Sequence, residues 1–141
     1  MELSLKITLL AMVAQIVLTI WAISRTGVAR LAVLKSKELH IRDIALSTDA
    51  YPTHVKQLQN NMRNQFETPP MFYAAVVLVA ALDLSNWGIA CAAVTYVLLR
   101  FWHRYVHVGN NNVILRFKVF LASLFSLSAI WLLIAAEILL S

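Results

Sequence analysis

The chain has 141 residues, of which 60% are hydrophobic and only 13% are charged, with a formal net charge of +5. Soluble domains carry roughly 25% charged residues, so this composition indicates a membrane protein with room for one domain, residues 1–141. The single cysteine, Cys91, excludes a disulfide framework and a cysteine-based metal site. Because it lies in an apolar run, we expect a buried and unreactive thiol.

Four apolar segments follow one another along the chain, and a membrane-spanning helix takes about 20 mostly apolar residues. The first and last reach that length by themselves, whereas the middle two reach it only by including neighbouring polar residues. The short connection at residues 84–87 leaves room only for a tight hairpin, so the middle segments are predicted to be antiparallel neighbours. The segments are residues 3–24, 70–84, 87–99 and 117–140. The predicted fold is therefore an all-α bundle of four transmembrane helices.

A stripe of polar residues precedes the second segment. A helix is predicted to begin with Thr53 as its N-cap and to continue to Pro69 and Pro70. These prolines lack backbone donors and should kink the helix near the membrane boundary. Four polar residues recur at positions i, i+3, i+4 and i+7, which share one face of a helix. They are Asn60, Arg63, Asn64 and Glu67.

Two interpretations of this first stripe are open. Arg63 and Glu67 have the spacing of a helical ion pair, which would make the stripe a neutral patch that holds helices together. Alternatively, the stripe binds a small zwitterionic ligand. Arginine would then bind a carboxylate, Glu67 an ammonium group, and the amides the ligand's peptide groups.

The third segment ends in a second polar stripe, with the same spacing and no carboxylate on the same helix. Such cations indicate a lipid phosphate or another anionic ligand. Arg104 is expected to extend to lipid headgroups, whereas Arg100, one turn deeper, is expected to bind a ligand or an ion-pair partner. The two histidines have the spacing of a zinc pair, but the neighbouring arginines disfavour a cation, so we predict no metal. The stripe consists of Arg100, His103, Arg104 and His107.

Arg116 follows a strong turn signal, Gly-Asn-Asn-Asn at residues 109–112, whose asparagines are suitable N-caps for the last helix. It therefore falls in or just past the first helical turn, where unpaired N–H groups already make a cation unfavourable. A bound anion would make a cation favourable at this position, because the helix terminus and Arg116 would both attract the anion. If the anion came from a thiol, the same field would favour the thiolate. The alternative is an arginine at the membrane interface.

All Lys and Arg residues except Lys6 lie in or beside the first and third connections. In a four-helix hairpin arrangement these connections share one side, and the positive-inside rule places that side in the cytoplasm. Both termini and the hairpin around Asp83 are then non-cytoplasmic. This topology accounts for the excess positive charge without a nucleic-acid partner.

Two segments resemble the MAPEG family, the membrane-associated proteins in eicosanoid and glutathione metabolism. The segment RNQFETPPMF, residues 63–72, is similar to the family's Arg-Asn-x-x-Glu segment followed by proline. The segment RFWHRYVHVGNNNVILRF, residues 100–117, is similar to the family's segment between the third and fourth helices. A weaker match is TGVAR, residues 26–30. The HVGNNNV portion is most like bacterial members, so the bacterial inner membrane is the expected location.

The resemblance implies a four-helix transmembrane protein that assembles as a homotrimer, with glutathione as a co-substrate bound between subunits near the cytoplasmic side. It also implies that lipophilic substrates enter from the surrounding membrane lipids. Arg116 matches the arginine proposed to stabilise the glutathione thiolate, and so is the expected catalytic residue. The positions that match glutathione contacts are Arg30, Arg63, Asn64, Glu67, Arg100 and His103.

Two positions depart from the family's pattern. Asn60 stands where many catalytic members have arginine, and His107 stands where they have tyrosine. Both positions help to hold glutathione in the family, so we expect both side chains to line the site. The predicted function is a glutathione-dependent transferase or peroxidase acting on lipophilic electrophiles. The alternatives are a non-catalytic lipid-binding or partner-presenting protein, which the two departures favour, and a proton or ion pathway through the two histidines.

Overall fold

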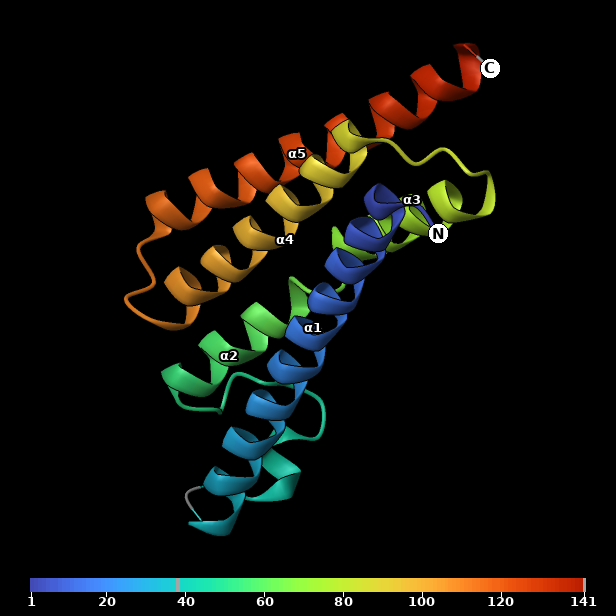
Figure 1. The fold of residues 1–141 in the computed structure, drawn as a ribbon. Coiled ribbons are helices and arrows are strands. Elements are labelled where there is room, and N and C mark those ends of the chain that lie inside the picture. The colour runs from blue at the N-terminus through green and yellow to red at the C-terminus, as the bar shows by residue number, and fades with distance from the viewer. Residues whose placement is uncertain (38, 141) are drawn as a thin grey trace.

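The computed structural model describes residues 1–37 and 39–140, and these residues form only helices, turns and loops. They contain five α-helices and one short 3-10 helix (Figure 1). The elements are α1 Leu3–Lys35, η1 Ile41–Ile44, α2 Thr53–Arg63, α3 Pro69–Ala81, α4 Trp87–Val108 and α5 Val113–Leu140.

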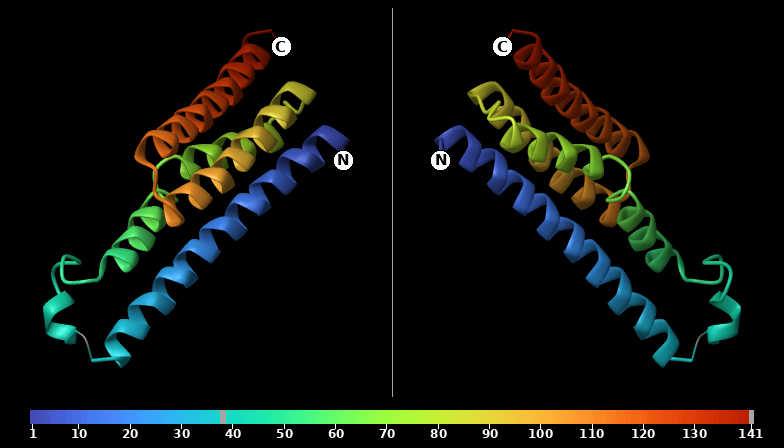
Figure 2. Two further views of the ribbon diagram at one scale, coloured as in Figure 1. Left: turned by 90° about the vertical axis from the view of Figure 1, so that its left-hand side faces the viewer. Right: turned by 90° about the vertical axis from the view of Figure 1, so that its right-hand side faces the viewer.

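The long helices form an up-and-down bundle with α4 at its centre. Both ends of the chain and the connection between α3 and α4 lie at one end, and the connection between α4 and α5 lies toward the other (Figures 1 and 2). Helix α4 contacts α1, α2 and α5, whereas α3 contacts α1 and α5. The ends at which the connections lie match the prediction, but α3 and α4, which were predicted to be antiparallel neighbours, meet through side chains and have few close backbone contacts.

The core of the bundle is formed by apolar side chains from α3, α4 and α5, with Ala11 added from α1. The Phe72 ring of α3 stacks on the Tyr96 ring of α4, with 4.6 Å between ring centroids. Small residues such as Ala75 and Ala93, both fully buried, leave room for these large rings. The stacked rings thus lie between the backbones of α3 and α4, although the connection that joins the two helices is short.

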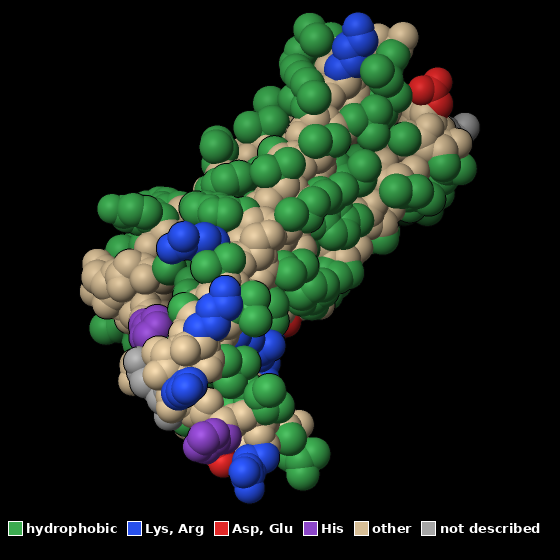
Figure 3. Space-filling model, turned by 90° about the horizontal axis from the view of Figure 1, so that it is seen from below, with side chains coloured by type: hydrophobic (Ala, Val, Ile, Leu, Met, Phe, Trp, Pro, Cys, Tyr) green, Lys and Arg blue, Asp and Glu red, His purple; other side chains and the backbone are tan. Residues whose placement is uncertain are grey.

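Hydrophobic side chains also cover much of the outer surface (Figure 3). Helices α1 and α5 are each long and apolar enough to cross a membrane, while α3 is shorter. Exposed apolar side chains run along both long helices, including Leu10, Val17, Phe125 and Leu132. Such extended apolar surface indicates contact with lipid or with other subunits. Four membrane crossings remain a prediction.

The first polar stripe does not lie on one continuous helix, as the sequence had suggested. Helix α2 ends at Arg63, residues 64–68 form a turn and bend, and Pro69 begins α3. Proline fits the first turn of a helix, where its missing N–H is not needed, so the prolines start a new helix and do not kink an old one. The predicted N-cap is also wrong by one residue, since Pro52 is at the N-cap and Thr53 is the first helical residue.

The continuity of α4 matches the prediction from its stripe, whereas the end of α1 and the exposure of Cys91 differ from the sequence-based expectations. Helix α1 continues to Lys35, beyond the predicted end at residue 24, and α4 continues without a break through its polar stripe to Val108. No glycine or proline interrupts either extension except Gly27, which a helix tolerates. Cys91 is exposed on the surface of α4 and not buried as expected.

Candidate functional site

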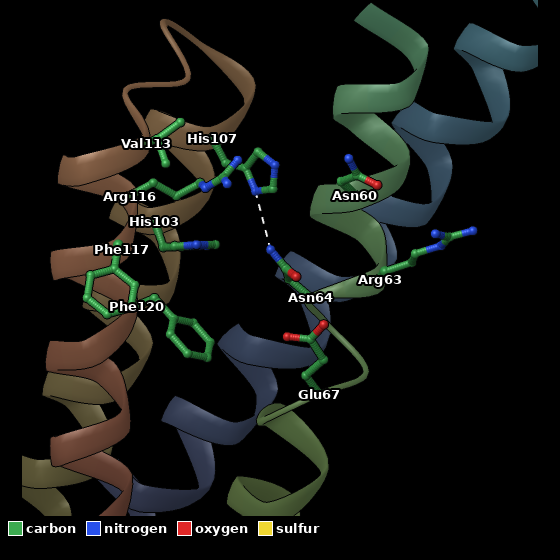
Figure 4. A pocket seen from close by; sticks show the side chains of 10 residues that line it. All are labelled: Asn60, Arg63, Asn64, Glu67, His103, His107, Val113, Arg116, Phe117 and Phe120. Atoms are coloured by element: carbon green, nitrogen blue, oxygen red, sulfur yellow. Dashed lines mark hydrogen bonds between the residues drawn. The ribbon is translucent and has the colours of Figure 1, made fainter. Parts of the chain in front are cut away.

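The first polar stripe faces the two histidines of the second stripe across a cavity of about 490 Å³ (Figure 4). One wall comes from α2 and the turn that follows it, and the other comes from α4 and the start of α5. Its volume falls within the range of about 300–1,000 Å³ typical of small-molecule sites. The lining residues are Asn60, Arg63, Asn64, Glu67, His103, His107, Val113, Arg116, Phe117 and Phe120.

Arg116 reaches the cavity from the first turn of α5, and the preceding asparagines position it. The side chain of Asn112 accepts a hydrogen bond from Leu115 N at 3.0 Å and so caps the helix. Asn111 adopts a left-handed conformation with φ of 50°, which asparagine tolerates. Its Oδ1 accepts a hydrogen bond from Arg116 Nη1 at 2.7 Å. The predicted turn and cap are confirmed, and they hold the guanidinium against this wall.

The two histidines of α4 extend the same wall. Their rings pack edge to face with 5.5 Å between centroids, and His103 also lies 5.9 Å from the Phe120 ring. His107 links this wall to the opposite one, because its Nδ1 lies 3.3 Å from Asn64 Nδ2. The side chains of His103 and His107 are nearly fully buried, so only their inner edges reach the cavity.

The opposite wall carries the carboxylate of Glu67, which is exposed and lies on the cavity side of the turn (Figure 4). Arg63 is exposed as well, but its guanidinium points away from Glu67 in the same view. Among the described residues, no ion pair joins Arg63 and Glu67. The pair that their spacing allowed does not form, because Glu67 lies in the turn and only Arg63 is helical. The neutral-patch interpretation therefore loses its basis.

Arg100 lies just behind the cavity and is fully buried. Its Nη2 donates a hydrogen bond to the backbone oxygen of Asn64 at 2.6 Å, which ties α4 to the opposite wall. Within the described residues, Arg100 Nε and Nη1 and His103 Nδ1 are buried and have no hydrogen-bond partner. A buried polar atom without a partner costs roughly 1–3 kcal/mol, so these atoms mark a region suited to a polar ligand.

A family model described as the MAPEG family matches residues 8–136, which is nearly the whole chain. The chain belongs to the MAPEG family. The family assignment predicted from the two segments is thereby confirmed, and with it the broad class of membrane proteins in eicosanoid and glutathione metabolism. No curated protein and no solved structure matches the chain.

Two arginines of this MAPEG protein lie outside the cavity. Arg30 of α1 lies 5.5 Å from the Tyr51 ring, and its Nε and Nη2 lie 2.8 and 2.6 Å from the side-chain amide of Gln59, which accepts from both when its oxygen faces them. Arg104 does not extend to the surface as expected. It is buried, donates to Asn61 Oδ1 and lies 4.2 Å from the centroid of the Trp21 ring.

Several lining residues of the MAPEG cavity were not among the predicted site residues. Helix α5 contributes three apolar side chains that flank Arg116, and together with Arg116 they repeat the i, i+3, i+4, i+7 spacing of the two stripes. This spacing could have predicted that the three residues line the cavity. It was not recognised because apolar residues do not stand out within an apolar helix. The three residues are Val113, Phe117 and Phe120. Gln57, whose Nε2 donates to His107 O at 2.5 Å, gave no signal in the sequence.

The histidine pair does not form part of a larger metal-ligand set in the described structure. Across residues 1–37 and 39–140, no group of three or more His, Cys, Asp or Glu side chains is arranged to hold a metal ion. Glu67, the acidic side chain of the first stripe, lies on the opposite wall of the cavity from the histidines (Figure 4).

Proposed function

We propose that this MAPEG protein is an integral-membrane glutathione-dependent transferase or peroxidase that acts on lipophilic electrophiles. The observation that carries the proposal is the position of Arg116, held by Asn111 at a cavity whose opposite wall carries Glu67 and Asn64. Cationic and anionic groups thus face each other across a space of suitable size. This arrangement suits a flexible zwitterionic ligand better than a simple anion.

The chemistry of glutathione matches the groups present in and behind the cavity. Its ammonium group can bind Glu67, and its carboxylates can bind Arg63, which is exposed and can turn toward a ligand, or the unpaired donors of Arg100. Asn60, Asn64, His103 and His107 offer hydrogen bonds to the peptide groups and carboxylates. The apolar rings of Phe117 and Phe120 give a lipophilic electrophile a surface beside the thiol.

Arg116 would stabilise the thiolate of bound glutathione, aided by the N-terminal end of α5. In conjugation, the thiolate forms a sulfur–carbon bond as the bond to the leaving group breaks with its electron pair, and the thiol proton passes to water. In peroxide reduction, two glutathione thiols become a disulfide while the peroxide becomes an alcohol and water. The protein supplies no nucleophile of its own in either reaction.

The assembly belongs to the same proposal. Arg30 lies outside the cavity of its own chain, so a role in binding glutathione requires a neighbouring copy, as in the homotrimer that the family resemblance implies. We also propose the bacterial inner membrane as the location, with the α1–α2 and α4–α5 connections in the cytoplasm.

The decisive experiment is conjugation of glutathione to chlorodinitrobenzene by wild type and by Arg116→Ala. Loss of one preorganised cationic donor should lower kcat by about 100- to 1,000-fold. Calorimetry should still detect glutathione binding to the variant, but the ultraviolet absorbance of the bound thiolate should be lost. Lys118→Ala is the matched control, because Lys118 is an exposed cation on the same helix that does not line the cavity. Unchanged turnover in Arg116→Ala contradicts the proposal.

The second candidate function is a non-catalytic lipid-binding or partner-presenting protein. It is favoured by Asn60 and His107, which replace an arginine and a tyrosine of catalytic members, and by the engagement of His107 with Asn64. Glutathione should then fail to raise the melting temperature of the purified protein. A glutathione-dependent rise in melting temperature would exclude this alternative as the sole function.

A further inference from the structure

A second cavity, of about 670 Å³, lies between α1 and α4. It shares no lining residue with the candidate glutathione cavity, so its chemistry can be considered independently. Six of its lining residues come from the last three turns of α4 and from Gly109, which follows that helix. The lining residues are Trp21, Arg25, Phe101, Trp102, Arg104, Tyr105, Val108 and Gly109. We call this cavity the α1–α4 groove.

The aromatic side chains of the groove are turned outward. Trp21 is 51% exposed, Trp102 52% and Tyr105 80%, so these rings do not serve the core of the chain. Trp102 and Tyr105 belong to the last turns of α4, and that end of α4 lies where it leads into α5, away from both chain termini (Figure 1). Tryptophan and tyrosine at such a position are typical of the interface between membrane and water. The groove therefore lies at the depth of lipid headgroups when the bundle spans the bilayer.

The groove also contains two cations and no acid. Arg25 is exposed, whereas Arg104 is buried with its guanidinium over the Trp21 ring. Arg104 donates a hydrogen bond to the neutral side-chain amide of Asn61. No Asp or Glu is present among the described residues that line the groove. Two guanidinium groups in one cavity without a carboxylate are suited to a phosphate.

Apolar surface continues from the groove along both helices. Leu98 is 64% exposed and lies one turn before Phe101 and Trp102 on α4, while Val17 is 56% exposed and lies one turn before Trp21 on α1. These side chains lead toward the end of the bundle that holds the termini, and so toward the hydrocarbon core. A ligand with a phosphate at one end and an acyl chain at the other fits this sequence of groups, whereas a soluble anion would leave the apolar part uncovered.

We propose that the α1–α4 groove is a binding site for an anionic phospholipid. Its phosphate lies against Arg25 with the charge of Arg104 beneath it, its glycerol region lies among Trp21, Trp102 and Tyr105, and an acyl chain follows the apolar surface. This site is separate from the glutathione cavity and does not depend on the function proposed for that cavity.

The test compares phosphatidylglycerol with phosphatidylcholine, added to the purified full-length protein in detergent while thermal stability is measured. Phosphatidylglycerol should raise the melting temperature of wild type more than phosphatidylcholine does. In Arg25→Gln the half-maximal phosphatidylglycerol concentration should rise about fivefold, the effect expected of one basic residue near an anionic surface. Lys118→Gln removes an equal charge on α5, outside the groove, and should behave as wild type.

A second variant keeps the test informative if a charge change disturbs folding. Trp102→Ala removes an exposed ring without changing any charge, and it should shorten the retention of phosphatidylglycerol measured by native mass spectrometry. Equal effects of the two lipids on wild type, or an equal loss in Arg25→Gln and Lys118→Gln, overturn the proposal. So does an equal stabilisation by inorganic phosphate, or a change of oligomeric state in Arg25→Gln without a change in lipid response, which would assign the groove to a second copy of the chain.

Discussion

His107 is the side chain that connects the two walls of the candidate site. The Asn64 amide nitrogen can only donate, so at 3.3 Å His107 Nδ1 must accept, and the ring hydrogen is then on Nε2. The backbone oxygen of the same residue accepts from Gln57 Nε2 at 2.5 Å. His107 thus orients Asn64, anchors the start of α2 and leaves one ring donor for a ligand. Its replacement of the family's tyrosine substitutes one polar group for another.

This position can be tested with two substitutions of different chemistry. His107→Phe keeps a ring but removes the acceptor for Asn64, so the affinity for glutathione should fall about 2- to 10-fold, the value of one hydrogen bond. His107→Asn keeps an acceptor at the place of Nδ1 and should lose less. Titration calorimetry with glutathione measures both. Equal affinities of His107→Phe and wild type would show that the link to Asn64 does not shape the site.

Among the helices, the two stripes show how far spacing alone predicts a site. The second stripe was predicted correctly to lie on one helix, because nothing interrupts α4, but its histidines and Arg104 line different cavities. The first stripe has the same spacing, but Pro69 begins a new helix and leaves Glu67 in a turn. Spacing identified six of the eight stripe residues as cavity-lining, but it misassigned the geometry of one wall and the positions of Arg100 and Arg104. The position of Arg104 depends on Trp21 and Asn61, which lie far from it in sequence.

The contact between α2 and α4 at Asn61 and Arg104 gives a prediction on stability. Asn61 is fully buried and accepts from the Arg104 guanidinium. Asn61→Leu should therefore lower the free energy of unfolding by about 1–3 kcal/mol, because it leaves a buried cation without this partner. The double variant Asn61→Leu/Arg104→Met should recover part of this loss.

The adjacent residue supplies the control for this pair. Asn60 is exposed on the same helix, so Asn60→Leu should change stability by no more than about 0.5 kcal/mol. Denaturant titration in detergent, followed by tryptophan fluorescence, compares the variants. A double variant less stable than both single variants would show that Asn61 and Arg104 contribute separately and not as a pair.

For the whole molecule, the arrangement of helices follows from features that the sequence displays openly. Apolar segments of sufficient length and a short connection place both termini and residues 82–86 at one end (Figure 1). The outer surface is harder to interpret. Cys91 lies in an apolar run, yet it is exposed on α4, because a helix surrounded by lipid has no need of a polar outer face. Hydrophobicity along a sequence therefore cannot distinguish core from lipid contact.

Orientation in the membrane gives the last prediction, and Cys91 makes it possible. In a Cys91→Ser background, Leu82→Cys places a thiol at an exposed position beside the α3–α4 connection. Ala50→Cys places one at an exposed position between η1 and α2. If the basic connections are cytoplasmic, a membrane-impermeant maleimide should label Leu82→Cys in intact cells and Ala50→Cys only after permeabilisation.

In wild type, Cys91 should remain unlabelled until detergent is added, because a thiol surrounded by hydrocarbon does not form the reactive thiolate. Reversed labelling of the two variants would place the candidate site on the non-cytoplasmic side. Labelling of Cys91 in intact membranes would mean that the outer face of α4 contacts water and not lipid.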